Sequence, residues 1–183
     1  VHYDGTAWTA STSGTTKRLV PVYGIDATHV FAVGDGGTAL MWNGTAWTAM
    51  TTGQTANLSD VWGLTANDVY AVGDQGTVIR YDGTAWAKVV PASFAPPGNL
   101  YAIRGISAND LLVAGALGGL FRYDVTAKTW TFMGTGTTNN LTGLAVLSAT
   151  DVWVVGQSGR LLHWDGTGLS FPDSGTLSSL SGI

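Results

Sequence analysis

Residues 58–86 read LSDVWGLTANDVYAVGDQGTVIRYDGTAW, and related stretches occur along the whole chain. The relatives begin at Leu19, Leu100 and Leu141, so successive copies start 39, 42 and 41 residues apart. Within each copy, turns rich in glycine, asparagine or aspartate separate short runs of β-type residues. No run has the spacing of an amphipathic helix. Each copy therefore predicts a meander of four strands.

The four runs of one copy differ in their expected environment. The first, residues 58–64, is expected to be the innermost strand. The second is apolar at every position from 69 to 72, as a strand covered on both faces must be. In the third, Arg80 alternates with apolar neighbours, and the fourth begins at Trp86 and is expected to be outermost.

A period near 40 residues with four strands is typical of a β-propeller blade. We therefore predict an all-β protein, a β-propeller of four-stranded antiparallel blades that forms a single domain over residues 1–183. The complete repeats fall at about residues 19–57, 58–99, 100–140 and 141–179.

The two ends of the sequence match parts of a further blade. Residues 1–18 match the third and fourth strands of a repeat, and residues 180–183 match the first strand. Two arrangements fit: a ring of about five blades with the fifth split between the termini, or a piece of a longer array of about six to eight blades. Because an incomplete ring exposes strand edges, we expect self-association through exposed blade edges.

The composition supports the all-β prediction and excludes some functions. Every acidic residue is Asp, and charged residues make up only 11% of the chain, which is a poor composition for helices. The net charge of −4 and the scattered arginines argue against nucleic-acid binding. No apolar run approaches the roughly 18 residues of a membrane span, so no membrane insertion is expected. The sequence begins at Val1 without a signal-like segment, which fits a processed protein or a fragment.

Two propeller families resemble these repeats. The block VYAVGD…VIRYDGTAW, where a strand ends in glycine and a Tyr precedes a Trp, resembles the kelch pattern, and the spacing of Tyr123 and Trp130 is kelch-like. DGTAW at 82–86 resembles part of the Asp-box of sialidase-type propellers. The whole block is similar to repeats of bacterial surface and secreted propellers, and less so to those of photosystem-assembly-factor propellers. The resemblance implies a propeller fold but does not choose among enzymes, lectins and scaffolds.

Two periodic features are interpreted as structural. Pairs such as Asn43-Gly44 and Asp82-Gly83 predict two-residue hairpin turns. A calcium site is not expected there, because one carboxylate per blade cannot supply the six or more oxygens that Ca²⁺ requires. Aromatic residues at fixed positions, such as Tyr81 and Trp86, are expected to pack between blades.

Candidate binding residues are those that break the repeat. One position of the innermost strand holds a different residue in each copy, ending with Ala145 in the fourth. The loop after the second strand keeps a glycine while its first residue changes, which is typical of a binding face and also of neutral surface drift. The predicted ligand-binding residues are Tyr23, Trp62, Arg104, Asp35, Asp74 and Gln157.

No catalytic, metal-binding or cofactor site is predicted. Glu, which a sialidase-like site requires, is absent, and His2, His29 and His163 lie in different repeats without metal-ligand spacing. Asp68 and its equivalents are expected to cap turns through hydrogen bonds to the backbone. The glycine-rich loops lack the Lys and the following helix of a phosphate-binding loop.

These observations favour a non-enzymatic binding module, extracellular or at the cell surface, that recognises a protein or carbohydrate ligand. Two alternatives stay open: a glycan-active hydrolase or lyase of the propeller type, and a purely structural repeat array. A catalytic blade would gather unusual His, Asp or Arg residues on one face, whereas here they are dispersed along the sequence.

Overall fold

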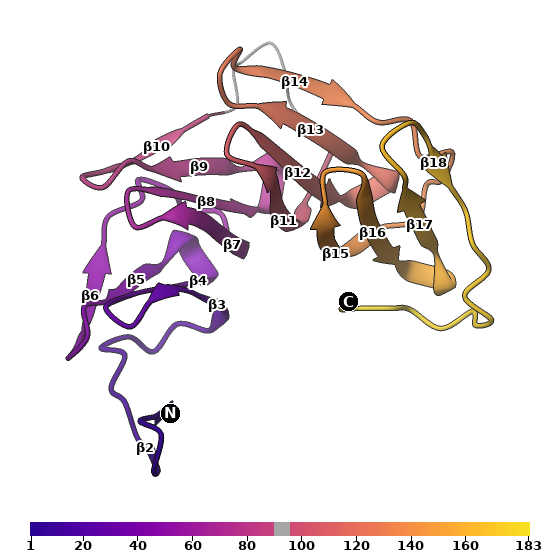
Figure 1. Cartoon of the computed structure of the whole chain (residues 1–183). Coiled ribbons are helices and arrows are strands. Elements are labelled where there is room, and N and C mark those ends of the chain that lie inside the picture. Colours follow the sequence, from indigo (N-terminus) through magenta and orange to yellow (C-terminus); the bar gives the residue numbers. More distant parts are fainter. Residues whose placement is uncertain (90–95) are drawn as a thin grey trace.

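The structure is a computed structural model that describes residues 1–89 and 96–183. It contains four four-stranded antiparallel sheets and one two-stranded hairpin. The four sheets stand side by side along an open arc, and the N-terminal hairpin lies beyond one end of that arc (Figure 1). Helical structure in the described part is limited to four short 3-10 segments, so the all-β prediction is confirmed.

Each sequence repeat forms one sheet, here called a blade, whose strands follow one another in chain order. Blade 1 contains β3 (Leu19–Asp26), β4 (His29–Gly34), β5 (Ala39–Trp42) and β6 (Trp47–Met50). Blade 2 contains β7 (Leu58–Thr65), β8 (Asp68–Gly73), β9 (Val78–Tyr81) and β10 (Trp86–Lys88). Blade 3 contains β11 (Leu100–Ser107), β12 (Asp110–Gly115), β13 (Leu120–Asp124) and β14 (Thr129–Phe132). Blade 4 contains β15 (Leu141–Ser148), β16 (Asp151–Gly156), β17 (Leu161–Trp164) and β18 (Leu169–Ser170).

The second and third strands of each blade are joined by a 3-10 turn. These turns are η1 (Asp35–Gly37), η2 (Asp74–Gly76), η3 (Ala116–Gly118) and η4 (Gln157–Gly159). The innermost strands β3, β7, β11 and β15 line the concave side of the arc and contact one another in that order (Figure 1).

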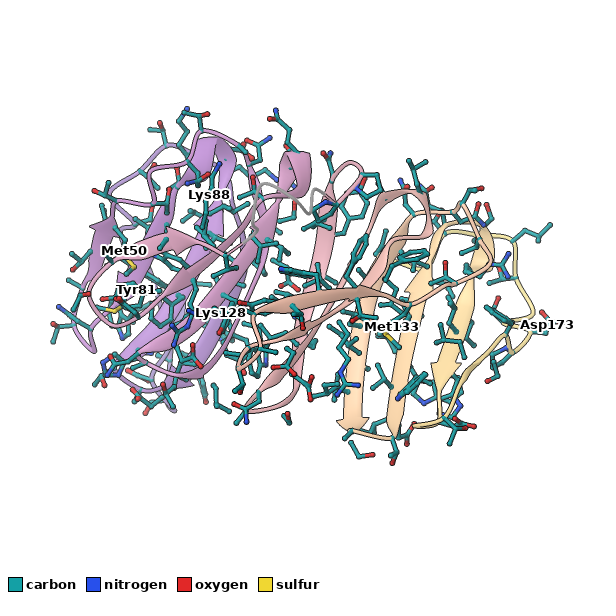
Figure 2. The ribbon with its side chains drawn as sticks, turned by 90° about the horizontal axis from the view of Figure 1, so that it is seen from above. Met50, Tyr81, Lys88, Lys128, Met133 and Asp173 are labelled. Carbon is teal, nitrogen blue, oxygen red and sulfur yellow. The ribbon has the colours of Figure 1, made fainter. Side chains whose placement is uncertain are left out.

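The hydrophobic cores lie between neighbouring blades. Alternate side chains of β8 enter opposite cores: Val69 packs toward blade 1, and Tyr70 packs toward blade 3. Both are fully buried, which explains why this run is apolar at every position. Seen from above, Met50 and Tyr81 lie side by side between the first two blades (Figure 2). The expected packing of periodic aromatic residues between blades is thus observed.

The Asp-Gly turns differ from the predicted two-residue hairpins. Tyr81 pairs with Trp86, so that residues 82–85 form a four-residue loop. The Asp82 carboxylate closes this wider loop by accepting hydrogen bonds from the backbone N–H groups of residues 84 and 85, both at 2.9 Å. Gly83 supplies the positive φ, 96°, that the loop requires. In blade 1 the amide oxygen of Asn43 makes the equivalent bonds.

These loops are predicted to make the fold acid-sensitive. Hydrogen bonds, the largest from the backbone N–H of Ala85, lower the pKa of Asp82 from 3.8 to about 2. A lowered folded-state pKa gives stability that is present above pH 4 and lost as the pH falls toward 2. Asp82→Asn keeps the acceptor, as Asn43 does, but removes the titration. We expect this variant to lose less stability than the wild type between pH 4 and pH 2 in urea unfolding experiments. Equal acid sensitivity of the two proteins would contradict this assignment.

The two chain ends behave differently. Residues 1–18 form the predicted outer hairpin, with β1 (His2–Tyr3) and β2 (Trp8–Thr9). The first strand predicted at residues 180–183 is not formed: Leu180 donates to the Gly156 carbonyl at 3.0 Å, but no strand is assigned. Among residues 1–89 and 96–183, no second strand pairs with this segment, so a ladder does not develop.

Candidate functional site

Two of the predicted site residues form an aromatic contact on the inner strands. Tyr23 on β3 and Trp62 on β7 have ring centroids 6.4 Å apart, with their planes tilted by 48°. The Trp62 indole in turn covers Gly105 on β11, where an added Cβ would lie 2.2 Å from Cη2 of the indole. Only glycine leaves room for this packing. Tyr23 and Trp62 therefore join the inner strands of three successive blades.

Arg104, the third predicted residue on these strands, is held by a buried carboxylate. Its Nη1 donates to Asp60 Oδ2 and to the carbonyl of Ile103, each at 2.6 Å. Asp60 also accepts from the backbone N–H of Ile103 at 2.8 Å and of Val61 at 2.9 Å. Burial raises the pKa of the Asp60 carboxyl, and the Arg104 guanidinium opposes this shift. The carboxylate thus ties blade 2 to blade 3.

The sequence analysis missed Asp60, although the sequence carries a signal for it. The equivalent positions in the other repeats hold Pro21, Ala102 and Gly143, none of which is charged. A single charge on an innermost strand therefore breaks the repeat as clearly as Trp62 does. The predicted inner-strand residues Tyr23, Trp62 and Arg104 share one register position, and Asp60 lies two residues before it.

Asp60 and Arg104 line a cavity of about 180 Å³ on the concave side of the arc. The inner strands of blades 3 and 4 contribute Tyr101 and Thr142, and residues 181–183 close it. The cavity therefore offers the Arg104 guanidinium and the Tyr101 phenol to a polar ligand, whereas the Thr142 hydroxyl donates to the Leu180 carbonyl at 2.6 Å. The Asp60 carboxylate accepts from Val61 of its own blade and from Ile103 and Arg104 of blade 3, so it acts as a crosslink between the two blades.

Asp35 and Asp74 share a second cavity of about 240 Å³. They stand at the starts of η1 and η2, and Asn57 lies between these turns. The Asn57 amide donates to Asp74 Oδ2 at 2.9 Å and accepts from the backbone N–H of Gly36 at 2.9 Å. Asn57, which directly precedes β7, thereby fastens the η1 turn of blade 1 to blade 2.

The same fastening recurs along the arc. Asn99 accepts from the backbone N–H of Gln75, and Asn140 accepts from that of Leu117, both at 3.1 Å. Gln157, the last predicted site residue, begins η4 in blade 4 and lies apart from the cavity that contains Asp35 and Asp74. The six predicted residues therefore lie at four separate places. Tyr23 contacts Trp62, Arg104 pairs with Asp60, Asp35 and Asp74 share one cavity, and Gln157 lies apart from the others.

Asp68 and its equivalents do not cap turns as predicted. Asp68 pairs with Arg80 at 2.6 Å and Asp110 pairs with Arg122 at 2.8 Å, each across two neighbouring strands. The turn itself is closed by a hydroxyl, such as that of Ser107, which accepts from the backbone N–H of residue 109. The cross-strand cation explains the difference, because an oppositely charged partner attracts the carboxylate more strongly than a neutral N–H does.

In the ranges 1–89 and 96–183, no group of three or more His, Cys, Asp or Glu residues could hold a metal ion. Within the same ranges, no helix is long and apolar enough to cross a membrane.

Solved structures similar to this chain share little sequence identity with it. A structure of YCF48 bound to D1 peptide has a TM-score of 0.76 over 98% of this chain, with 18% identity. The extracellular domain of a putative hybrid two-component system from B. thetaiotaomicron has a TM-score of 0.67 over 94% of this chain and 25% of its own, with 9% identity. The WD40 β-propeller domain of Doa1 has a TM-score of 0.51 over 88% of this chain and 69% of its own, with 14% identity. The fold is a β-propeller.

This propeller spans 61% of the length of the YCF48 chain that it matches. No family model and no curated protein matches it. The predicted fold class, with four-stranded antiparallel blades, is confirmed, and the predicted count of about five blades is consistent with the structure. At these sequence identities the likeness establishes the fold alone.

Proposed function

We propose that this propeller is a non-enzymatic interaction module that binds a segment of another protein at its inner strands and the adjoining turns. The observation that carries the proposal is the break in the repeat at Tyr23, Trp62 and Arg104, which lie on three successive inner strands. A structural neighbour, YCF48, is described in complex with a peptide, which supports a protein ligand over a carbohydrate.

The chemistry of these residues suits a peptide. A guanidinium has five N–H donors, and Asp60 and the Ile103 carbonyl occupy only part of those of Arg104. The remaining donors can bind backbone carbonyls or a carboxylate of the ligand. Tyr23 and Trp62 are half-buried and offer ring edges for apolar side chains. Asp35, Asp74 and Gln157 extend the proposed surface along the turns.

A parallel screen tests this function. The purified protein is offered to a displayed peptide library and to a glycan array. We expect peptide ligands whose affinity falls about tenfold in Arg104→Lys, because a lysine cannot reproduce the forked donor geometry. Arg80→Lys is the matched control, since Arg80 pairs with Asp68 away from the inner strands. Ligands found only on the glycan array, or peptide binding unchanged in Arg104→Lys, would contradict the proposal.

The finer features of the function are also proposals. We place the protein outside the cell or on its surface, a location supported by the extracellular domain among the structural neighbours. Its kelch-like, Asp-box-like and bacterial character rests on the sequence resemblance alone. A glycan-active hydrolase or lyase is the alternative in a different class, and it would require a free acid or base at the inner strands, where Asp60 already accepts three hydrogen bonds from the protein.

A second copy of the chain is a further proposed partner. Val22 of blade 1 is 60% exposed, whereas its equivalent in blade 2, Val61, is 1% exposed against the neighbouring blade. Val22 lines a largely apolar cavity of about 540 Å³ with Trp42 and Trp47, and Val1 and His2 of the N-terminal segment cover part of it. At the other end of the arc, Leu147 of blade 4 is 70% exposed. Inside the molecule, the face equivalent to that of Val22 packs against the preceding blade, and the face equivalent to that of Leu147 packs against the following blade. Head-to-tail stacking of two copies would therefore bring together two faces that are complementary within the chain.

A further inference from the structure

The outermost strand of blade 4 departs from the repeat at a single position. The other blades have a tryptophan there, and each of these indoles contacts an aromatic ring of the third strand, as Trp86 contacts Tyr81 at 5.4 Å between centroids. In blade 4, Leu169 pairs with Trp164 in the register in which Trp86 pairs with Tyr81. One indole of the repeat is therefore missing.

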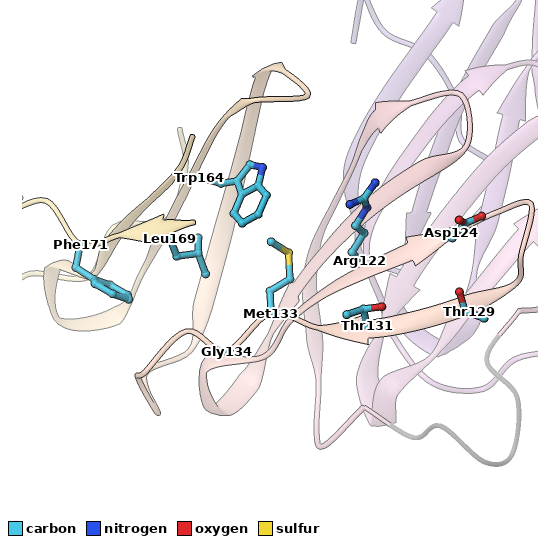
Figure 3. A pocket seen from close by; sticks show the side chains of 9 residues that line it. All are labelled: Arg122, Asp124, Thr129, Thr131, Met133, Gly134, Trp164, Leu169 and Phe171. Carbon is cyan, nitrogen blue, oxygen red and sulfur yellow. The ribbon is translucent and has the colours of Figure 1, made fainter. Parts of the chain in front are cut away.

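A cavity of about 610 Å³ opens beside Leu169, between blades 3 and 4 (Figure 3). Arg122 and Met133 of blade 3 line it from one side. Their equivalents in blade 1 are Met41 and Met50, which pack in the core that contains Trp86. The cavity is here called the rim groove. At the interface between blades 3 and 4 it occupies the position that the Trp86 indole fills at the interface between blades 1 and 2.

The walls of the rim groove suit an aromatic ring. Asp110 holds the Arg122 guanidinium by two hydrogen bonds of 2.8 Å, which fixes its plane. Guanidinium groups and thioethers such as that of Met133 both attract aromatic rings. Figure 3 shows Arg122, Met133 and Trp164 pointing into the same space. Phe171, which is 51% exposed, also lines the groove.

We propose that the rim groove binds an aromatic side chain, and indole in particular, that a partner polypeptide presents to it. The internal repeat itself indicates the shape that fits, because the other blades fill this position with their own tryptophan. The groove lies at the outer strands, whereas the surface of the proposed function lies at the inner strands. The two binding surfaces are therefore independent, and the loss of one leaves the other intact.

Titration with N-acetyl-L-tryptophanamide, followed by two-dimensional amide NMR spectra, tests the proposal. We expect saturable shifts of the amide signals of residues 122–134 and 164–171. N-acetyl-L-leucinamide should bind about tenfold more weakly, because it lacks the ring that the guanidinium and thioether attract. An absence of saturable shifts at these residues, or equal binding of the leucine compound, would overturn the proposal.

A variant that fills the rim groove with its own side chain gives the most direct test. Leu169→Trp restores the missing indole, so we expect a higher melting temperature and no binding of N-acetyl-L-tryptophanamide. Leu177→Trp, at a position that is 89% exposed, is the matched control and should bind as the wild type does. Retained binding in Leu169→Trp would refute the site. If Leu169→Trp does not fold, Met133→Ala replaces it, and undiminished affinity in that variant would refute the site equally.

Discussion

Replacing Asp60 by Ala is expected to lower the free energy of unfolding by about 3 kcal/mol. The Asp60 side chain is only 8% exposed and accepts hydrogen bonds from two backbone N–H groups and from Arg104. Its removal leaves the Ile103 N–H buried without its acceptor and Arg104 without its counter-charge. Since these bonds join blades 2 and 3, the loss should weaken the contact between blades. Urea unfolding followed by tryptophan fluorescence measures the change.

The Asp110–Arg122 pair provides the matched control. It has the same chemistry, but the Arg122 side chain is 48% exposed and the pair lies within one blade. Asp110→Ala should therefore cost about 1 kcal/mol or less, as exposed ion pairs do. Asp60→Asn retains an acceptor but not the charge, and it should fall between the two. A loss in Asp60→Ala no larger than in Asp110→Ala would show that the buried carboxylate does not join the blades.

Replacing Val22 by Asp is expected to weaken concentration-dependent self-association strongly. The substitution places a charge on the apolar end face of blade 1, where a second copy would bury it without a partner. The dissociation constant for self-association should rise about tenfold or more, since each 1.4 kcal/mol corresponds to a factor of ten. Sedimentation velocity over a wide range of protein concentrations measures the effect.

Leu117→Asp serves as the control for this experiment. Leu117 is 62% exposed, close to the 60% of Val22, but it lies at the tip of η3 between blades rather than on an end face. We expect this variant to associate as the wild type does. A wild-type protein that stays monomeric at every concentration, or two variants that behave alike, would rule out stacking through the end faces.

The fold was predicted well from the sequence because the same pattern of four strands and their turns occurs in four complete copies. Residues 69–72 of β8 are all apolar, and only burial between two blades satisfies such a pattern. The outer hairpin β1–β2 was also predicted, because its Tyr3 and Trp8 have the spacing of the complete blades. The segment 180–183 did not form a strand, since strand formation depends on a pairing partner that its own residues cannot supply.

The candidate site was predicted only in part. Variation between repeats identified Trp62 and Arg104, but the contact that organises Arg104 comes from Asp60, which is 44 residues away in the sequence. Which carboxylate meets which cation depends on the register between blades, and a repeat pattern within one blade does not contain that information. Asp68 was assigned to a turn for a different reason: its partner Arg80 lies on β9 of the same blade, and the sequence analysis considered only the turn next to Asp68.

The asparagines that fasten the turns connect successive blades. Asn57, Asn99 and Asn140 each accept a hydrogen bond from the turn of the blade before them, and Asn57 also donates to Asp74 in the turn that follows. The residue that each asparagine holds in blades 2 and 3 is a non-glycine residue with positive φ, Gln75 at 57° and Leu117 at 55°. Such a backbone is unfavourable by itself and persists because its surroundings impose it. Ser158 in blade 4 has the same positive φ, 55°, with no such bond among those described, so the turn forms within its own blade. The asparagine bonds therefore couple each finished turn to the first strand of the following blade, and local disorder in one blade is expected to reach the turn of the blade before it.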